Sequence, residues 1–296
     1  MKILYITEGV GEDYQRDILF HGLRCLYGGD VVDVNPINSM YQSSLPNKSN
    51  LYGRGFTIYC NLQNIDVDRS DIENKIRNQF FDMIVFGSIH RFAQYYDLVD
   101  QSYSTNKVAC VDGEDRWGGP YNGIVNVKFP YFKRECDENT NTFPIQFGIP
   151  KEKVCLDKPT KIRNLSNQIP KLRSANSYQF NNELEYYKEY QESCFAITTK
   201  KAGWDALRHY EIIANHCVPL FEEIENCPNL TLHKFPKELC IKANTLYNDK
   251  FSKMENSSED SEYQELLHDF VSYIPNITTE SVAIAFIDQM KVLQNK

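Results

Sequence analysis

Short apolar runs alternate with amphipathic stretches along the first half of the chain. Unbroken apolar runs predict buried strands, and apolar positions spaced three and four residues apart predict helices. The expected strands are residues 2–7, 31–34, 83–86 and 107–111, with 56–60 as a further candidate after a polar, loop-like stretch. The expected helices are residues 14–27 and 70–81, the second begun by Ser70 or Asp71. This alternation predicts an α/β fold with a parallel, doubly wound sheet, which binds ligands at the carboxyl ends of its strands.

The same alternation returns after a polar run at residues 137–141. The expected elements there are a helix at 181–192, strands at 194–198 and 218–221, and a helix at 280–293. At about 150 residues per domain, a chain of 296 residues predicts two domains. We place an N-terminal Rossmann-like domain at 1–142 and a C-terminal one at 143–296. The last helix is a candidate to pack back on the first domain.

The turn after the strand at 194–198 has the composition of an anion site. Such a turn presents unpaired backbone N–H groups and the positive end of a helix dipole to a ligand. Basic side chains in the turn and in the first helical turn would meet a phosphorylated ligand as fixed cations, and Glu211 would accept from sugar hydroxyls. The expected binding set is Thr199, Lys200, Lys201, Gly203, Asp205, Arg208, His209 and Glu211.

Residues 208–219, which read RHYEIIANHCVP, resemble the nucleotide-sugar half of glycosyltransferases with two Rossmann-like domains, the GT-B type. Within that group the segment looks most like the exostosin-like proteins. The family's glutamate usually grips the donor's ribose, and the resemblance gives this role to Glu211. Gly203 stands eight residues before it, where many retaining members carry a second acid, so an inverting enzyme is favoured. His216 departs from the usual glycine. The resemblance is specific over residues 178–240.

The resemblance also implies the substrates. The donor would be a nucleoside diphosphate sugar, with UDP as the family-level expectation and either a pentose such as xylose or a hexose as the sugar. The acceptor would be a hydroxyl of a glycan or glycoconjugate. The nucleotide sugar is then a co-substrate, and neither a cofactor nor a metal ion is expected.

An inverting transfer needs a general base beside the acceptor hydroxyl. The loops that follow first-domain strands offer Asp112, Glu114, Asp115 and His90 for this role, and Glu8 and Asp13 come next. Each of the first four also has an ordinary interpretation as a turn residue, a helix cap or a buried histidine. The segment 131–135 mixes aromatic with basic residues and is either a flank of the acceptor site or an edge strand.

Two alternatives to this function stay open. Asp66 and Asp68 match the D-x-D pattern that holds a divalent metal in single-domain (GT-A) transferases, although Ser70 and Asp71 beside them suggest the start of a helix. A non-enzymatic carbohydrate-binding protein with the same fold is the second alternative. Metal dependence and donor consumption separate the three hypotheses.

The net charge and the cysteine pattern further narrow the class of protein. A formal charge of −8 argues against a general nucleic-acid binder, which needs a basic face. No apolar run approaches the roughly 20 residues of a membrane span. The nine cysteines form no C-x-x-C pair, which is typical of reduced core residues. Residues 1–6 run straight into Glu8, so we expect a first strand rather than a leader peptide and a cytoplasmic protein.

Overall fold

The computed structural model describes residues 1–116, 127–138, 142–170 and 180–295. Within these residues, six parallel strands form one sheet in the order β2-β1-β3-β4-β5-β6. This larger sheet consists of β1 (Ile3–Ile6), β2 (Val31–Asp33), β3 (Met83–Phe86), β4 (Val108–Asp112), β5 (Tyr131–Lys133) and β6 (Phe143–Pro144). A mixed α/β fold with a parallel sheet is therefore confirmed, and it is consistent with a Rossmann-like architecture.

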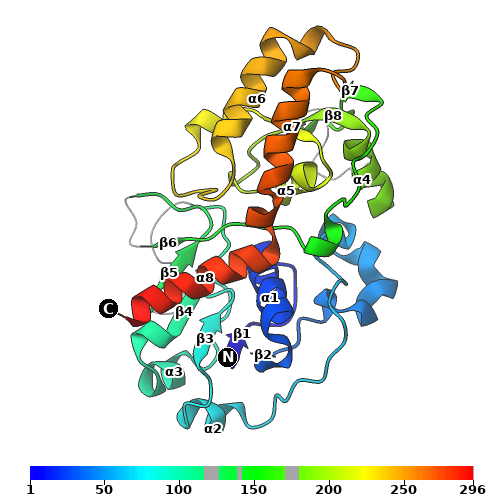
Figure 1. Ribbon diagram of the computed structural model, residues 1–296. Helices are drawn as coiled ribbons and strands as arrows, with labels where there is room; N and C mark the ends of the chain where they lie inside the picture. The colour runs from blue at the N-terminus through cyan, green and yellow to red at the C-terminus, as the bar shows by residue number, and fades with distance from the viewer. Residues whose placement is uncertain (117–126, 139–141, 171–179, 296) are drawn as a thin grey trace.

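Helices cover both faces of the larger sheet, as a parallel sheet requires. Ile3 and Tyr5 of β1 point into a core formed with two helices, and Leu4 and Ile6 point into a second core formed with two others. The first pair is α1 (Tyr14–Tyr27) and α8 (Thr279–Gln294), and the second is α2 (Ile72–Arg77) and α3 (Tyr96–Ser102). Figure 1 shows these elements gathered at the bottom of the molecule, and we call described residues 1–144 together with α8 the lower part.

A smaller sheet lies at the other end of the molecule. Its described strands are parallel, in the order β7-β8-β9. They are β7 (Arg163–Leu165), β8 (Ser193–Thr198) and β9 (Val218–Phe221), and the helices around them are α4 (Glu183–Gln191), α5 (Leu207–Ala214), α6 (Lys237–Asp249) and α7 (Ser261–Tyr273). We call described residues 163–273 the upper part (Figure 1).

The chain passes between the two parts twice, and the two passages touch. The N–H of Ile149 donates to the carbonyl of Ile277 at 2.9 Å, and the N–H of Thr279 donates to the carbonyl of Ile149 at 2.9 Å. After the second passage, α8 packs along α1 in the lower part (Figure 1). The approach is so close that a Cβ at Gly22 would lie 2.0 Å from the carbonyl oxygen of Thr279. Only glycine fits there.

Three expectations differ from the structure. Residues 56–60 form turns rather than a strand, because Thr57 and Cys60 have φ angles of 70° and 62°, which no strand accommodates. Helix α2 is shorter than the expected 70–81, since Asp71 at its start has a left-handed φ of 54° and its side chain does not cap the helix. Strand β6 pairs with β5, so the larger sheet extends past the boundary expected at 142. Residues 139–141 of the polar run lie outside the described residues.

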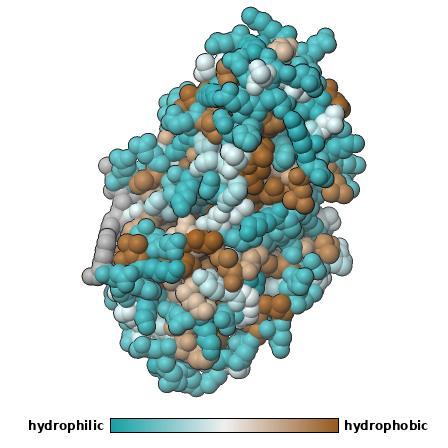
Figure 2. Space-filling model, in the orientation of Figure 1, coloured by the Kyte–Doolittle hydropathy of each residue, from teal (hydrophilic) through white to brown (hydrophobic). Residues whose placement is uncertain are grey.

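The hydrophilic surface and the free cysteines are as the amino-acid composition predicts. Hydrophilic residues cover most of the face in Figure 2, with small hydrophobic patches near the waist between the two parts. All nine cysteines are free thiols, and most are buried. Among the described residues, the helices are too short or too polar to cross a membrane.

Candidate functional site

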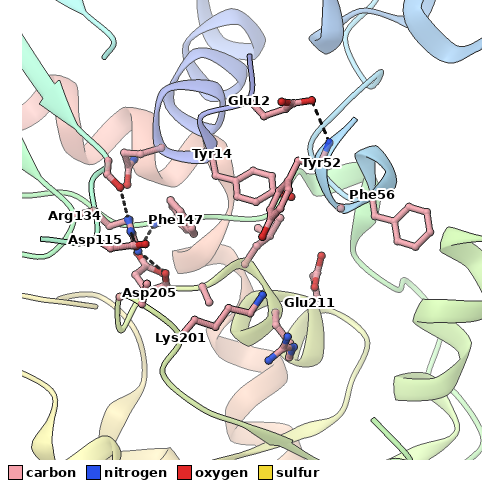
Figure 3. Close-up of a pocket in the computed structure, with 18 of the residues that line it drawn as sticks. Glu12, Tyr14, Tyr52, Phe56, Asp115, Arg134, Phe147, Lys201, Asp205 and Glu211 are labelled. Carbon is pink, nitrogen blue, oxygen red and sulfur yellow. Dashed lines mark hydrogen bonds and ion pairs between the residues drawn. The ribbon is translucent and has the colours of Figure 1, made fainter. Parts of the chain in front are cut away.

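A cleft of about 560 Å³ lies between the lower and upper parts. Its walls are loops that follow the carboxyl ends of strands in both sheets, which is where parallel sheets hold their ligands. The loops after β1, β3 and β4 contribute from the lower part, and the loops after β7 and β8 contribute from the upper part. Figure 3 draws Glu12 and Tyr14 of the lower part at its top and Lys201 of the upper part toward its bottom. The cleft lies at the same loops in which the sequence analysis placed its candidate binding and catalytic residues.

The upper wall carries cations with few partners. Lys201 lies in the turn after β8 and Arg208 lies in the first turn of α5, and both line the cleft. Nη1 of Arg208 is buried and, among the described residues, has no hydrogen-bond partner. Partial removal from solvent and the neighbouring Arg208 lower the pKa of Lys201. Together with the amino end of α5, these groups form a wall that favours an anion.

Glu211 lies on the same wall but already accepts two hydrogen bonds. The Tyr186 hydroxyl donates to Oε2 at 2.5 Å, and the Thr57 hydroxyl donates to Oε1. Burial raises the pKa of Glu211, and these two donors only partly oppose the shift. Each carboxylate oxygen has a second lone pair, so Glu211 retains acceptor capacity toward the cleft.

Three members of the expected binding set do not line the cleft. Thr199 and Lys200 lie outside it, and the Lys200 ammonium sits 5.1 Å from the ring centroid of Trp204. His209 is fully buried, with Nδ1 at 2.8 Å from the Thr198 hydroxyl and Nε2 at 2.8 Å from the Trp204 carbonyl. Burial lowers its pKa to about 3. His209 is therefore neutral, and the expectation that it serves as a fixed cation is wrong.

A buried arginine binds two carboxylates and a backbone carbonyl where the two parts meet. Arg134 follows β5, forms ion pairs with Asp115 and Glu135, and donates to the backbone carbonyl of Asp205 at 2.5 Å. Burial raises the pKa of Asp205 to about 7, against the opposing charge of Arg134. A Cβ at Gly203 would lie 2.5 Å from Oε1 of Glu135. The acids beside Gly203 thus come from the lower part of the molecule.

Only one of the four base candidates, Asp115, lines the cleft. The other three cluster behind the lower wall, where His90 lies 3.2 Å from Glu114 and 3.4 Å from Asp112. Asp112 accepts from Lys133 at 2.9 Å. Burial acts to raise the pKa of Asp112, but Lys133 and His90 outweigh it and hold the pKa below its ordinary value. This cluster is suited to a structural role.

The sequence analysis placed Asp13 after these four candidates. Asp13 lines the cleft at the start of α1, where its Oδ1 accepts from the N–H of Arg16 and its Oδ2 accepts from the Ser88 hydroxyl at 2.6 Å. The helix-capping position was the available signal. Sequence reasoning also left the aromatic residues of the cleft unassigned. These are Tyr14, Tyr52, Phe56, Phe147, Phe180 and Tyr186.

The D-x-D pair stands apart from the cleft. Oδ1 of Asp68 accepts from the N–H of Ser70 at 2.9 Å, and Oδ2 pairs with Lys75 at 2.8 Å, so this carboxylate closes the turn before α2. Neither Asp66 nor Asp68 lines the cleft. The described residues contain no cluster of three or more histidine, cysteine or acidic side chains placed to hold a metal ion.

Comparison with models of protein families and with curated protein sequences found no match. A function for this chain is therefore inferred from the geometry of the cleft.

Proposed function

We propose that this chain is a glycosyltransferase of the two-Rossmann-domain (GT-B) type. It would move a sugar, with inversion and without bound metal, from a nucleoside diphosphate donor to a hydroxyl of a glycan or glycoconjugate. UDP is our choice of nucleotide. The observation that carries the proposal is the pair of cleft-facing cations, Lys201 and Arg208, at the amino end of α5, opposite a lower wall that supplies carboxylates.

The upper wall would bind the donor. Lys201, Arg208 and the first N–H groups of α5 would hold the diphosphate, and Glu211 would accept from the ribose hydroxyls. When the bond between the sugar and the diphosphate breaks, negative charge develops on the leaving oxygen. Fixed cations stabilise that charge more in the transition state than in the ground state, so they would increase the rate of transfer.

The lower wall would supply the base. Asp115 is the first candidate and Asp13 the second, since both line the cleft. The base would take the proton of the acceptor hydroxyl while the acceptor oxygen attacks the anomeric carbon. The nucleoside diphosphate would leave from the opposite face with the electron pair of the broken bond. Donor and acceptor held on opposite walls permit this geometry.

Two adjacent lysines test the donor assignment. Lys201 faces the cleft, and Lys200 lies outside it. In calorimetric titrations with UDP, we expect Lys201→Ala to weaken binding about tenfold, equivalent to about 1.4 kcal/mol, because it removes a charged partner of the diphosphate. Lys200→Ala serves as the matched control and should change affinity less than twofold. Equal effects of the two substitutions, or no binding of UDP to the unmodified chain, would refute the proposal.

The lower wall also favours a second candidate function. Asp115 forms an ion pair with Arg134, and the other three base candidates lie behind the wall. A protein that binds a sugar nucleotide without turnover would show this arrangement. Release of UDP from UDP-sugars, measured with and without acceptor glycans, distinguishes the two: a transferase consumes donor, and a binding protein leaves it intact.

A further inference from the structure

A second cavity, of about 190 Å³, lies beside the two chain passages and shares none of its described lining residues with the cleft. Its walls come from both parts of the molecule. Phe132 and Ala285 belong to the lower part, His233 and Lys234 belong to the upper part, and Gln146 lies just before the first passage. At about 30 Å³ for each water molecule, the cavity has room for about six, which is enough for a small organic ligand.

One side of the cavity is apolar. The ring centroids of Phe132 and Phe286 lie 4.7 Å apart, where α8 packs against β5 (Figure 1). Ile145 and Val282 are buried, and they complete this side together with Ala285. Small-molecule sites typically combine such preformed apolar walls with a few placed polar groups. The body of a ligand here would therefore be apolar.

Two buried polar atoms of the lining residues lack partners. Gln146 is only 2% exposed, and its Oε1 accepts from the N–H of Lys234 at 2.8 Å, which fixes the end of the amide that carries nitrogen. Nε2 of Gln146 is buried and has no hydrogen-bond partner among the described residues, and the same is true of Nδ1 of His233. A buried donor without an acceptor is costly, and a ligand oxygen would satisfy it.

Lys234 gives the cavity a positive charge. Burial lowers the pKa of His233 to about 4, so its ring is neutral near pH 7. Lys234 is then the one charged side chain among the described residues that line the cavity, and its ammonium forms no ion pair with a described residue. An anion would meet this cation and the Gln146 amide, with no carboxylate in the described lining to oppose it.

We infer that this cavity binds a small carboxylate with an apolar body. The body packs against Phe132, Val282 and Ala285, and the carboxylate oxygens accept from Nε2 of Gln146 and pair with the Lys234 ammonium. The ligand would contact both parts of the molecule. This site is separate from the cleft, so the inference does not depend on the proposed function.

Ligand-observed NMR titrations with small carboxylates test this assignment. The carboxylate probes are hexanoate and phenylacetate, their amides are the matched neutral compounds, and hexylamine is the cation. We expect at least one carboxylate to bind at least fivefold more tightly than its amide and than hexylamine. Lys234→Gln should remove this preference. Lys291→Gln is the matched control, because it removes a charge from α8 outside the cavity, and it should leave the preference unchanged.

Filling the cavity provides a second test that is independent of charge. Ala285 is half-buried, so Ala285→Leu extends into the cavity without disturbing the buried face of α8. We expect it to weaken carboxylate binding at least tenfold while the circular dichroism spectrum stays unchanged. Binding that survives Lys234→Gln or Ala285→Leu would place the carboxylate elsewhere, and the cleft would be the first place to look. Equal binding of carboxylate and amide, tighter binding of hexylamine, or no binding of either carboxylate would also overturn the inference.

Discussion

Glu211 accepts hydroxyl hydrogen bonds from both parts of the molecule, from Thr57 below and from Tyr186 above. The sequence identified this glutamate through a local pattern but gave no indication of its partners, which come from positions far away in the chain. A buried carboxylate that loses a donor bears the full cost of its desolvation. The contribution of the Thr57 hydroxyl to the free energy of unfolding can therefore be measured.

We expect Thr57→Val to lower the free energy of unfolding by about 1 to 3 kcal/mol, because it leaves Oε1 of Glu211 without its hydroxyl donor. In a double-mutant cycle with Glu211→Gln, followed by urea denaturation, the two substitutions should be non-additive by more than about 0.5 kcal/mol. Additive effects would show that the hydrogen bond does not contribute. Ser44→Ala is the control, because it removes a hydroxyl that donates to the Asn38 carbonyl at 2.7 Å near the surface rather than to a buried carboxylate.

Asp205 gives a pH dependence with a definite sign. Its pKa is raised to about 7 by burial, above the unfolded value of about 3.9, so the folded state holds the proton more tightly. The stabilisation is complete below about pH 4 and is lost as the pH rises toward 7. The free energy of unfolding of Asp205→Asn, relative to that of the unmodified chain, should therefore increase from pH 5 to pH 8 by up to about 2 kcal/mol. Urea denaturation of both chains at pH 5 and pH 8 measures the difference in their free energies of unfolding. A difference that does not change with pH would contradict this expectation.

At the scale of elements, β1, β2, β3, β4, β8 and β9 were predictable because each contains a buried apolar run. Strands β6 and β7 were not, because they are two and three residues long and only partly buried. The 56–60 run failed because its apolar residues pack as turns with left-handed φ angles, which no periodicity reports. The part of the upper wall between β8 and α5 was also predictable, since it is one continuous segment. The lower wall was not, because it brings together Tyr14, Tyr52, Asp115 and Arg134 from four separate segments.

The contact between α1 and α8 depends on Gly22. Even the single methyl group of Gly22→Ala would overlap the Thr279 carbonyl, so α8 must shift. We expect a loss of about 2 to 4 kcal/mol in the free energy of unfolding, at the upper end of overpacking costs. Gly29→Ala is the matched control, because the nearest atom to its new Cβ lies 3.9 Å away, and it should change stability by less than about 0.5 kcal/mol. Similar effects of both substitutions would contradict the close packing.

At the scale of the whole molecule, Glu183 ties the two parts together beside the cleft. Its Oε2 pairs with Lys48 of the lower part at 2.8 Å and with Lys153 at 3.0 Å, and its Oε1 accepts from the N–H of Thr57. We expect Glu183→Gln to loosen this attachment, so that hydrogen exchange around Thr57 speeds up by about tenfold or more while β1 and β3 stay protected. Uniform acceleration across the larger sheet would indicate general destabilisation instead.

The paired chain passages at Ile149 and Thr278 have a mechanical consequence. Because the two connections are hydrogen-bonded to each other, they act as one pivot rather than two separate tethers. Once the contacts of Glu183 and Glu211 between the two parts are broken, connections gathered at one point let the parts swing or twist but not slide. Any motion that widens the cleft must therefore be a rotation about this point, so the largest displacements fall at the rim farthest from it. Spectroscopic labels placed across that rim would report the swing, while labels beside the pivot would keep a constant separation.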